Sequence, residues 1–427
     1  MNSIQQRNLL LFIGGRLISL IGSGIQMIAI PLFILDYTGS GTLMGVFTML
    51  CMIPMLLVAP LAGVLGDRWN RKGIAVYTDL GRGMMIMLLA WLAFGHRMNI
   101  TVLFTAQIFI SIMDGLFNTA TAAMLADLVD SDDFNRANAS KSAVDCLSMI
   151  IGPVVGGIIY GISGIQMVFF LNALSFILSA LCEIFILYRM PLQNKAKLKI
   201  RSFITENRDA LSFINNYRGL QQLFIFVMIA NFLVAPIIMV VFPYVLKRGI
   251  GFTSQQYGYI MTSFMAGLLI GNVLIGSLLA KARSGTMVKT GLLIQGFLLM
   301  VIAMIFFPAI VKEFNGPTWS LFGVIAGSFL VSGVFNAMVN TPLMTNLQKM
   351  VPPDMRARFF AALGLITQFA IPVGSLIYGF LLDKIPAHLI LGAVGVLNFA
   401  ITLFFFKYAS PEAYEPTVTF QETITTD

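Results

Sequence analysis

The chain has 427 residues, of which 58% are hydrophobic and only 11% are charged, and its formal net charge is +8. An apolar share this large exceeds that of a soluble globular domain, so the composition predicts a polytopic membrane protein. The positive charge does not indicate a nucleic-acid-binding protein, because the lysines and arginines stand in short segments between apolar runs.

Twelve apolar segments are long enough for a membrane-spanning helix, which needs roughly 20 residues. They are residues 8–35, 42–66, 74–95, 100–126, 137–162, 165–190, 219–246, 255–281, 286–310, 317–347, 357–381 and 386–408. Helix is the expected structure, because lipid offers no partners to unpaired backbone groups. The first segment is too long for the apolar region of a cleaved signal peptide, so we expect it to remain as a helix.

A long basic connection divides these spans six and six. We therefore predict a six-helix bundle at 1–190, a cytoplasmic linker at 191–218, a second six-helix bundle at 219–408 and a disordered cytoplasmic tail at 409–427. Apolar residues between 203 and 214 recur at near-helical spacing. They predict either an amphipathic surface helix or a solvated basic linker, and the sequence leaves both open.

The loops with an excess of lysine and arginine predict that both termini are cytoplasmic. The exceptions are few: Arg97, Lys247, Arg248, Lys312 and Lys384 fall on the other side, and Arg16 lies inside the first span. Sequence similarity between residues 133–161 and 354–379, about half the chain apart, indicates a duplicated six-helix unit.

Residues 63–72, Gly-Val-Leu-Gly-Asp-Arg-Trp-Asn-Arg-Lys, place one acid and three bases in a short turn between two spans. The stretch resembles the signature that the major facilitator superfamily carries between its second and third helices, with matches at Gly63, Leu65, Asp67, Arg68, Arg71 and Lys72. We expect Asn70, which replaces a glycine of the signature, to adopt a left-handed turn conformation. The resemblance implies a cytoplasmic gate in which Asp67 meets the start of the eleventh span and Arg71 holds Asp127, with Arg136 nearby.

The fifth predicted span contains Gly152, Pro153, Gly156 and Gly157. Glycines one turn apart let two helices approach closely, and the proline kinks its own helix. The group resembles the core of a motif associated with antiporters in the drug-exporting branches of the superfamily, which implies a role in export. Simple helix packing is the alternative.

Three charged residues stand deep in the spans of the first half: Arg16, Asp114 and Asp145. A buried charge is costly in a membrane, so such residues are candidates for function. We expect that at least one of Asp114 and Asp145 exchanges protons during transport; the alternative is that both acids are structural partners of Arg16. The i,i+3 pair Asp79 and Arg82 and the lone Glu183 are assigned to packing.

Polar side chains in the spans are the candidate substrate contacts. They are Gln26, Asn118, Asn231, Asn336, Asn340 and Gln368. The 26 methionines and 36 phenylalanines would suit a promiscuous lipophilic pocket, although any membrane bundle is rich in both.

Over its whole length the chain resembles the macrolide-efflux-like branch of drug:proton antiporters, through residues 16–22, 37–40, 67–72 and 353–359. The resemblance implies an all-α membrane protein of two pseudo-symmetric six-helix bundles, the major facilitator fold. It implies proton-coupled export of lipophilic or amphipathic compounds by alternating access, in a bacterial inner membrane. A lysophospholipid or lipid flippase is the alternative, followed by a siderophore exporter and a non-transporting sensor. We expect no enzymatic activity, cofactor, metal site or nucleic-acid partner, and a monomer whose partners are the substrate, protons and membrane lipids.

Overall fold

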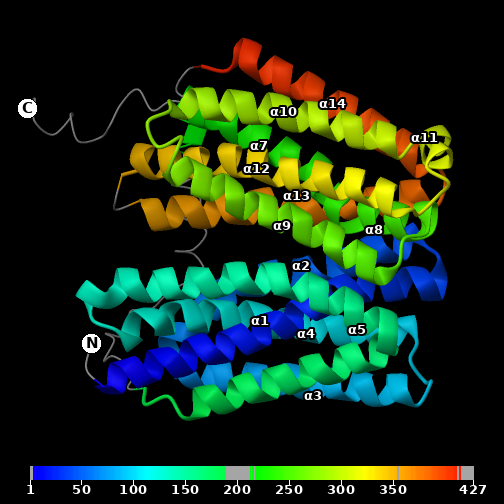
Figure 1. Ribbon diagram of the computed structural model, residues 1–427. Helices are drawn as coiled ribbons and strands as arrows, with labels where there is room; N and C mark the ends of the chain where they lie inside the picture. The colour runs from blue at the N-terminus through cyan, green and yellow to red at the C-terminus, as the bar shows by residue number, and fades with distance from the viewer. Residues whose placement is uncertain are drawn as a thin grey trace, which may run out of the picture. The chain divides into compact units, whose positions relative to one another are not determined.

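The computed structural model describes residues 3–188, 212, 214, 215, 217–352, 355–410, 413 and 414 (Figure 1). Within this part of the chain all regular elements are helical, and 11 of them are long and apolar enough to cross a membrane. The helices are α1 Ser3–Thr38, α2 Gly41–Arg68, α3 Arg71–Phe94, α4 Ile100–Leu128, α5 Phe134–Ile184, α7 Arg218–Pro236, α8 Phe242–Tyr244, α9 Ser254–Gly276, α10 Ser284–Ile305, α11 Pro308–Glu313, α12 Trp319–Met350, α13 Arg356–Leu382 and α14 Ala387–Tyr408. Wider π-helical turns at Ile237–Val241 and Val245–Ile250 continue α7 through α8 as one span.

Helix α5 contains two of the predicted spans. Its 51 residues would measure roughly 77 Å as one straight helix, more than twice the thickness of the apolar layer of a membrane. The chain breaks at Gly164, whose φ of 72° and ψ of −173° are not helical and favour glycine. The twelve predicted spans are therefore all present, the fifth and sixth on either side of Gly164.

The chain forms two compact units. The first comprises residues 1–39, 46–198 and 253–262, and the second comprises residues 40–45, 199–252 and 263–427. The predicted bundles, 1–190 and 219–408, differ from these units at two short segments, because residues 40–45 belong to the second unit and residues 253–262 to the first. The predicted linker lies almost entirely outside the described residues.

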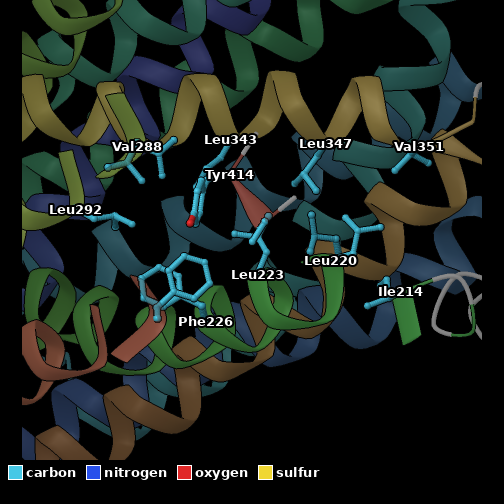
Figure 2. Packing of buried hydrophobic residues seen from close by; sticks show 14 of the residues in the cluster. Ile214, Leu220, Leu223, Phe226, Val288, Leu292, Leu343, Leu347, Val351 and Tyr414 are labelled. Atoms are coloured by element: carbon cyan, nitrogen blue, oxygen red, sulfur yellow. The ribbon is translucent and has the colours of Figure 1, made fainter. Parts of the chain in front are cut away.

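A large apolar cluster fills one end of the second unit (Figure 2). Its buried members come from α7, α10, α12, α13, α14 and the segment after α14, and include Leu220, Leu223, Phe226, Val288, Leu292, Leu343, Leu347, Phe359, Phe405 and Tyr414. The rings of Phe226 and Phe405 stack with their centroids 4.3 Å apart. Tyr414 lies among side chains of α7, α10 and α12, so this residue joins several helices (Figure 2).

The predicted disordered tail thus includes a packed segment. Ala413 and Tyr414 are only 3% and 7% exposed. The Asn346 side chain donates a hydrogen bond of 2.8 Å to the Tyr414 carbonyl, and Lys289 Nζ lies 4.3 Å from the centroid of the tyrosine ring. The polar composition of the tail predicts disorder, but one aromatic ring with a fitting site is enough to anchor these two residues. Residues 415–427 lie outside the described part.

Replacing Tyr414 with alanine is expected to destabilise the second unit by about 2–4 kcal/mol, because the change empties a packed aromatic site. The loss should appear as a lower thermal unfolding temperature of the purified protein in detergent. Tyr408→Ala is the matched control, since the Tyr408 side chain is 54% exposed. Equal unfolding temperatures for the two variants would contradict a packing role for Tyr414.

Candidate functional site

A cluster of charged residues is buried in the first unit. Helix α3 contributes Asp79 and Arg82, α4 contributes Asp114 and α5 contributes Glu183. Asp79, Arg82 and Glu183 are 0%, 4% and 3% exposed, whereas the Asp114 side chain is 31% exposed. Arg82 donates hydrogen bonds to Asp79 and, through Nη1, to Asp114 Oδ1 at 2.5 Å. We call these four residues the Arg82 cluster.

Two aromatic rings fix the position of Arg82. Its guanidinium carbon lies 4.2 Å from the ring centroid of Phe117 in α4 and 4.4 Å from that of Phe176 in α5. An arginine between aromatic faces gains cation–π attraction, which is strongest where water is excluded. The rings therefore help to hold a positive charge that would otherwise be costly at this depth.

The predicted ion pair of Arg16 and Asp145 is present. Arg16 Nε and Nη2 donate to the two carboxylate oxygens at 2.6 and 3.0 Å, and Lys141 Nζ adds a third contact at 2.9 Å. Two bases around one acid favour the ionised form of Asp145, which supports the structural alternative for this residue. Asp114 is not a partner of Arg16, because its ion pair is with Arg82 of α3.

The basic turn after α2 holds a second group of polar contacts. Arg71 Nη1 donates to Asp127 Oδ2 at 2.7 Å, as predicted, and the Tyr188 hydroxyl donates to the same oxygen at 2.6 Å. Burial, followed by the neighbouring Asp127 carboxylate, raises the pKa of the Tyr188 hydroxyl, which keeps it protonated as a donor. Lys72 Nζ donates to the carbonyl of Ile184 at 2.7 Å. The ends of α3, α4 and α5 are therefore joined at this turn.

The structure places other residues of the predicted gate differently from the prediction. Arg136 is exposed, and its guanidinium forms no ion pair with Asp127 in the described part of the chain. Asn70 is extended rather than left-handed, with φ −63° and ψ 112°. It serves as the N-cap of α3, because its side chain accepts hydrogen bonds from the backbone N–H groups of Lys72 and Gly73. Gly63 lies within α2, where a side chain would meet nothing within 4 Å. The side chains of Asp67 and Arg68 lie outside the described ones.

The glycines of the fifth predicted span lie where other backbones come very close. A methyl group on Gly152 would lie 2.7 Å from Gly24 Cα, and one on Gly156 would lie 2.7 Å from the Ile25 carbonyl oxygen of α1. A methyl group on Gly157 would lie 2.5 Å from the carbonyl oxygen of Ser254 at the start of α9. These positions need glycine for packing, whatever their role in export.

The predicted substrate contacts fall in both units. In the first unit, Gln26 is buried and accepts a hydrogen bond from Asn172 of α5, which favours a packing role, while Asn118 is exposed. In the second unit, the Asn231 side chain donates to the carbonyl of Thr367 at 3.3 Å. The remaining three lie on α12 and α13: Asn340 Nδ2 donates to Asn336 Oδ1 at 2.9 Å, and Gln368 is exposed.

Asp383, which directly follows α13, was not predicted to have a role. Within the second unit its carboxylate accepts hydrogen bonds from the backbone N–H groups of Gly41 and Thr42, at 2.6 and 3.0 Å, and from the Ser40 hydroxyl at 2.8 Å. It thus caps the first turn of α2 from a distant part of the sequence. Burial acts to raise the pKa of Asp383, but the hydrogen bonds from Thr42, Ser40 and Gly41 outweigh it, so the pKa lies below its ordinary value.

Asp383→Asn is expected to destabilise the protein by about 0.5–1.5 kcal/mol at neutral pH, a modest value because the carboxylate is exposed. A lowered pKa in the folded state stabilises the protein above the unfolded value of about 3.9. That contribution disappears as the pH falls through the lowered pKa. Thermal unfolding measured across a pH series should therefore show a constant gap between wild type and variant above about pH 5, closing below about pH 4. A gap that widens on acidification would contradict this assignment.

Sequence comparison identifies the family. The sequence profile of the Major Facilitator Superfamily matches residues 12–236 and 224–424. The chain is 23% identical over 375 residues to macrolide efflux protein A of Streptococcus pyogenes, covering 88% of this chain and 89% of that protein. It is 24% identical over 380 residues to the multidrug efflux pump Tap of Mycobacterium tuberculosis, and the match covers 86% of this chain and 85% of Tap.

Solved structures share the fold. The nucleoside transporter NupG superposes with a TM-score of 0.69 at 14% identity, covering 95% of this chain and 99% of that one. A bacterial homologue of the human lysosomal transporter Spinster superposes with a TM-score of 0.70 at 13% identity, and the match covers 98% of this chain and 100% of that one. With its many membrane-spanning helices and its resemblance to macrolide and drug efflux proteins, the chain is a transporter and not an enzyme, and it belongs to the major facilitator superfamily.

Proposed function

We propose that the protein exports lipophilic or amphipathic compounds in exchange for protons, by alternating access of its two units. Its similarity to proteins named for macrolide and multidrug efflux supports the class of cargo. The observation that carries the proton coupling is the Arg82 cluster, in which Arg82 pairs with Asp79 and Asp114 while a third acid, Glu183, is buried on the adjoining helix α5. Charge of this kind is costly unless protons or water offset it, so the cluster is suited to binding and releasing protons.

The turn after α2 is the proposed cytoplasmic gate. Its support is the contact of Arg71 and Tyr188 with Asp127, which ties the ends of three helices of the first unit together. Asp67 and Arg68 are included in this gate only because residues 63–72 resemble the signature that the superfamily carries between its second and third helices. Ion pairs at a partly exposed turn stabilise by a modest amount, so they can bias a conformational equilibrium without locking it. In this proposal both termini are cytoplasmic and the protein acts as a monomer in a bacterial inner membrane.

The test is transport by the purified full-length protein in liposomes. We expect ethidium or radiolabelled erythromycin to move against its gradient when a pH gradient is imposed, and to stop when an ionophore collapses that gradient. Transport that ignores the pH gradient would overturn the proton coupling. Transport of neither compound, together with movement of fluorescent lysophosphatidylcholine between leaflets, would overturn the cargo class in favour of a lipid flippase.

A further inference from the structure

We propose that Glu183 of α5 is the proton-binding site. The burial of Glu183 near Asp79, which is paired with Arg82 on α3, favours the binding of a proton there. Its part in transport rests on the proposed proton coupling, whereas the binding of a proton rests on the geometry of the cluster alone. The sequence analysis assigned Glu183 to packing. In the structure it is buried, as are Asp79 and Arg82 of the neighbouring helix α3.

The charges of the Arg82 cluster do not balance. Arg82 can neutralise one of the carboxylates Asp79, Asp114 and Glu183. Asp114 is 31% exposed and accepts a hydrogen bond of 2.5 Å from Arg82 Nη1, so it is the least buried of the three and has a charged partner. Asp79 is completely buried but accepts a hydrogen bond from Arg82, which favours its ionised form. Glu183 is left as the carboxyl with the least compensation.

The surroundings of Glu183 do not replace the missing charge. It is 3% exposed, and its Oε2 atom is buried without a hydrogen-bond partner among the described residues, as is Oδ2 of Asp79. A carboxylate oxygen in that position has lost its hydration without gaining a partner, which favours the protonated acid.

Two further cations lie at the end of α5, because Lys72 Nζ donates to the Ile184 carbonyl at 2.7 Å and Arg7 Nη2 donates to the Phe185 carbonyl at 3.3 Å. Both are bound by backbone oxygens, and neither forms an ion pair with Glu183 among the described residues. Asp79 and Arg82 of α3 act electrostatically on Glu183, and Arg82 lies over the ring of Phe176, about two helical turns before Glu183 on α5. Two thiols also belong to this region, Cys51 of α2 near Asp114 and Cys182, which precedes Glu183 in α5. Helix α1 approaches this part of α5 with Gly15, where a side chain would touch Ser179 and Cys182.

The members of the Arg82 cluster lie at different distances from the ends of their helices. Glu183 is the second-last residue of α5, next to the contact of Lys72 with Ile184. Arg82 lies about 16 Å along α3 from Arg71, and Asp114 lies about 21 Å along α4 from its end at Leu128, at about 1.5 Å per residue. Release of the Glu183 proton to water leaves a carboxylate that competes with Asp114 for Arg82. Protonation at the end of α5 is thereby coupled to the ion pair in the middle of α4.

Infrared difference spectroscopy of the purified full-length protein during a pH titration tests the binding site directly. We expect a carbonyl band of a protonated carboxylic acid that disappears as the pH rises. Glu183→Gln should remove this band and Glu183→Asp should retain a shifted one. Glu313→Gln, at an exposed position of α11, should leave it unchanged. A titrating band that survives unaltered in Glu183→Gln would overturn the proposal, and so would a wild type without any such band.

Transport in liposomes tests the role of the site. Ethidium accumulation driven by a pH gradient should be lost in Glu183→Gln, whereas Glu313→Gln should accumulate ethidium as the wild type does. A Glu183→Gln variant that still responds to the gradient would overturn the coupling role. If the wild type itself ignores the gradient while the infrared band depends on Glu183, the proposed function fails and the proton site stands. A folded Glu183→Asp variant distinguishes loss of the acid from loss of the protein.

Discussion

Arg82→Gln is expected to destabilise the protein by about 3–5 kcal/mol, the largest effect we predict for one side chain. The change leaves Asp79 and Asp114 without their shared partner, and Asp79 is completely buried. It also removes the cation between the rings of Phe117 and Phe176. We expect poor recovery of monodisperse protein and a strongly lowered thermal unfolding temperature in detergent.

A double variant separates charge from packing in this prediction. Arg82→Gln combined with Asp79→Asn removes both charges and should be more stable than Arg82→Gln alone, because no uncompensated carboxylate remains at Asp79. Arg82→Lys keeps the charge but loses the forked geometry, so it should be intermediate. Arg97→Gln, at an exposed position between α3 and α4, is the matched control. If Arg82→Gln were as stable as this control, the carboxyls would not depend on Arg82.

The length and number of the spans could be predicted because the membrane sets them. A helix must cross about 30 Å of hydrocarbon, so the apolar run alone locates it to within a few residues. Details that depend on local backbone geometry were out of reach. The π-helical turns that extend the α7 span to Ile250 carry no distinct sequence pattern. The packing of Tyr414 depends on a site formed by three other helices, which composition cannot reveal.

Contacts of the candidate site were predictable where both residues belong to one helix or stand at a similar depth in the membrane. Asp79 and Arg82 are three residues apart on one helix, and Arg16 and Asp145 stand at similar depth. Depth alone does not say which way a helix is rotated, so it could not assign Asp114 to Arg82 rather than to Arg16. The same limit hid Glu183, whose significance comes from residues on another helix. Asp383 was missed because the group it binds is a helix end more than three hundred residues away in the sequence.

The close contact of α1 and α5 makes a second strong prediction, at Gly156. An added methyl group would lie 2.7 Å from the Ile25 carbonyl oxygen and 2.9 Å from Ile25 Cα. Both are backbone atoms of a long helix, so relief requires moving α1 itself rather than turning a side chain. Gly156→Ala is therefore expected to destabilise the first unit by about 1–3 kcal/mol, although alanine is the better helix former.

Gly161→Ala gives the comparison that isolates this effect. Gly161 lies on the same helix, but an added methyl group there would come no closer than 3.5 Å to its neighbours, an ordinary contact. Without a clash, the helix preference of alanine should leave the protein as stable as wild type or up to about 1 kcal/mol more stable. Opposite shifts in thermal unfolding temperature for two identical substitutions on one helix would trace the loss to the approach of α1. If both variants shifted alike, the glycines would act through the flexibility of α5, and their proposed role in export would rest on bending rather than on packing.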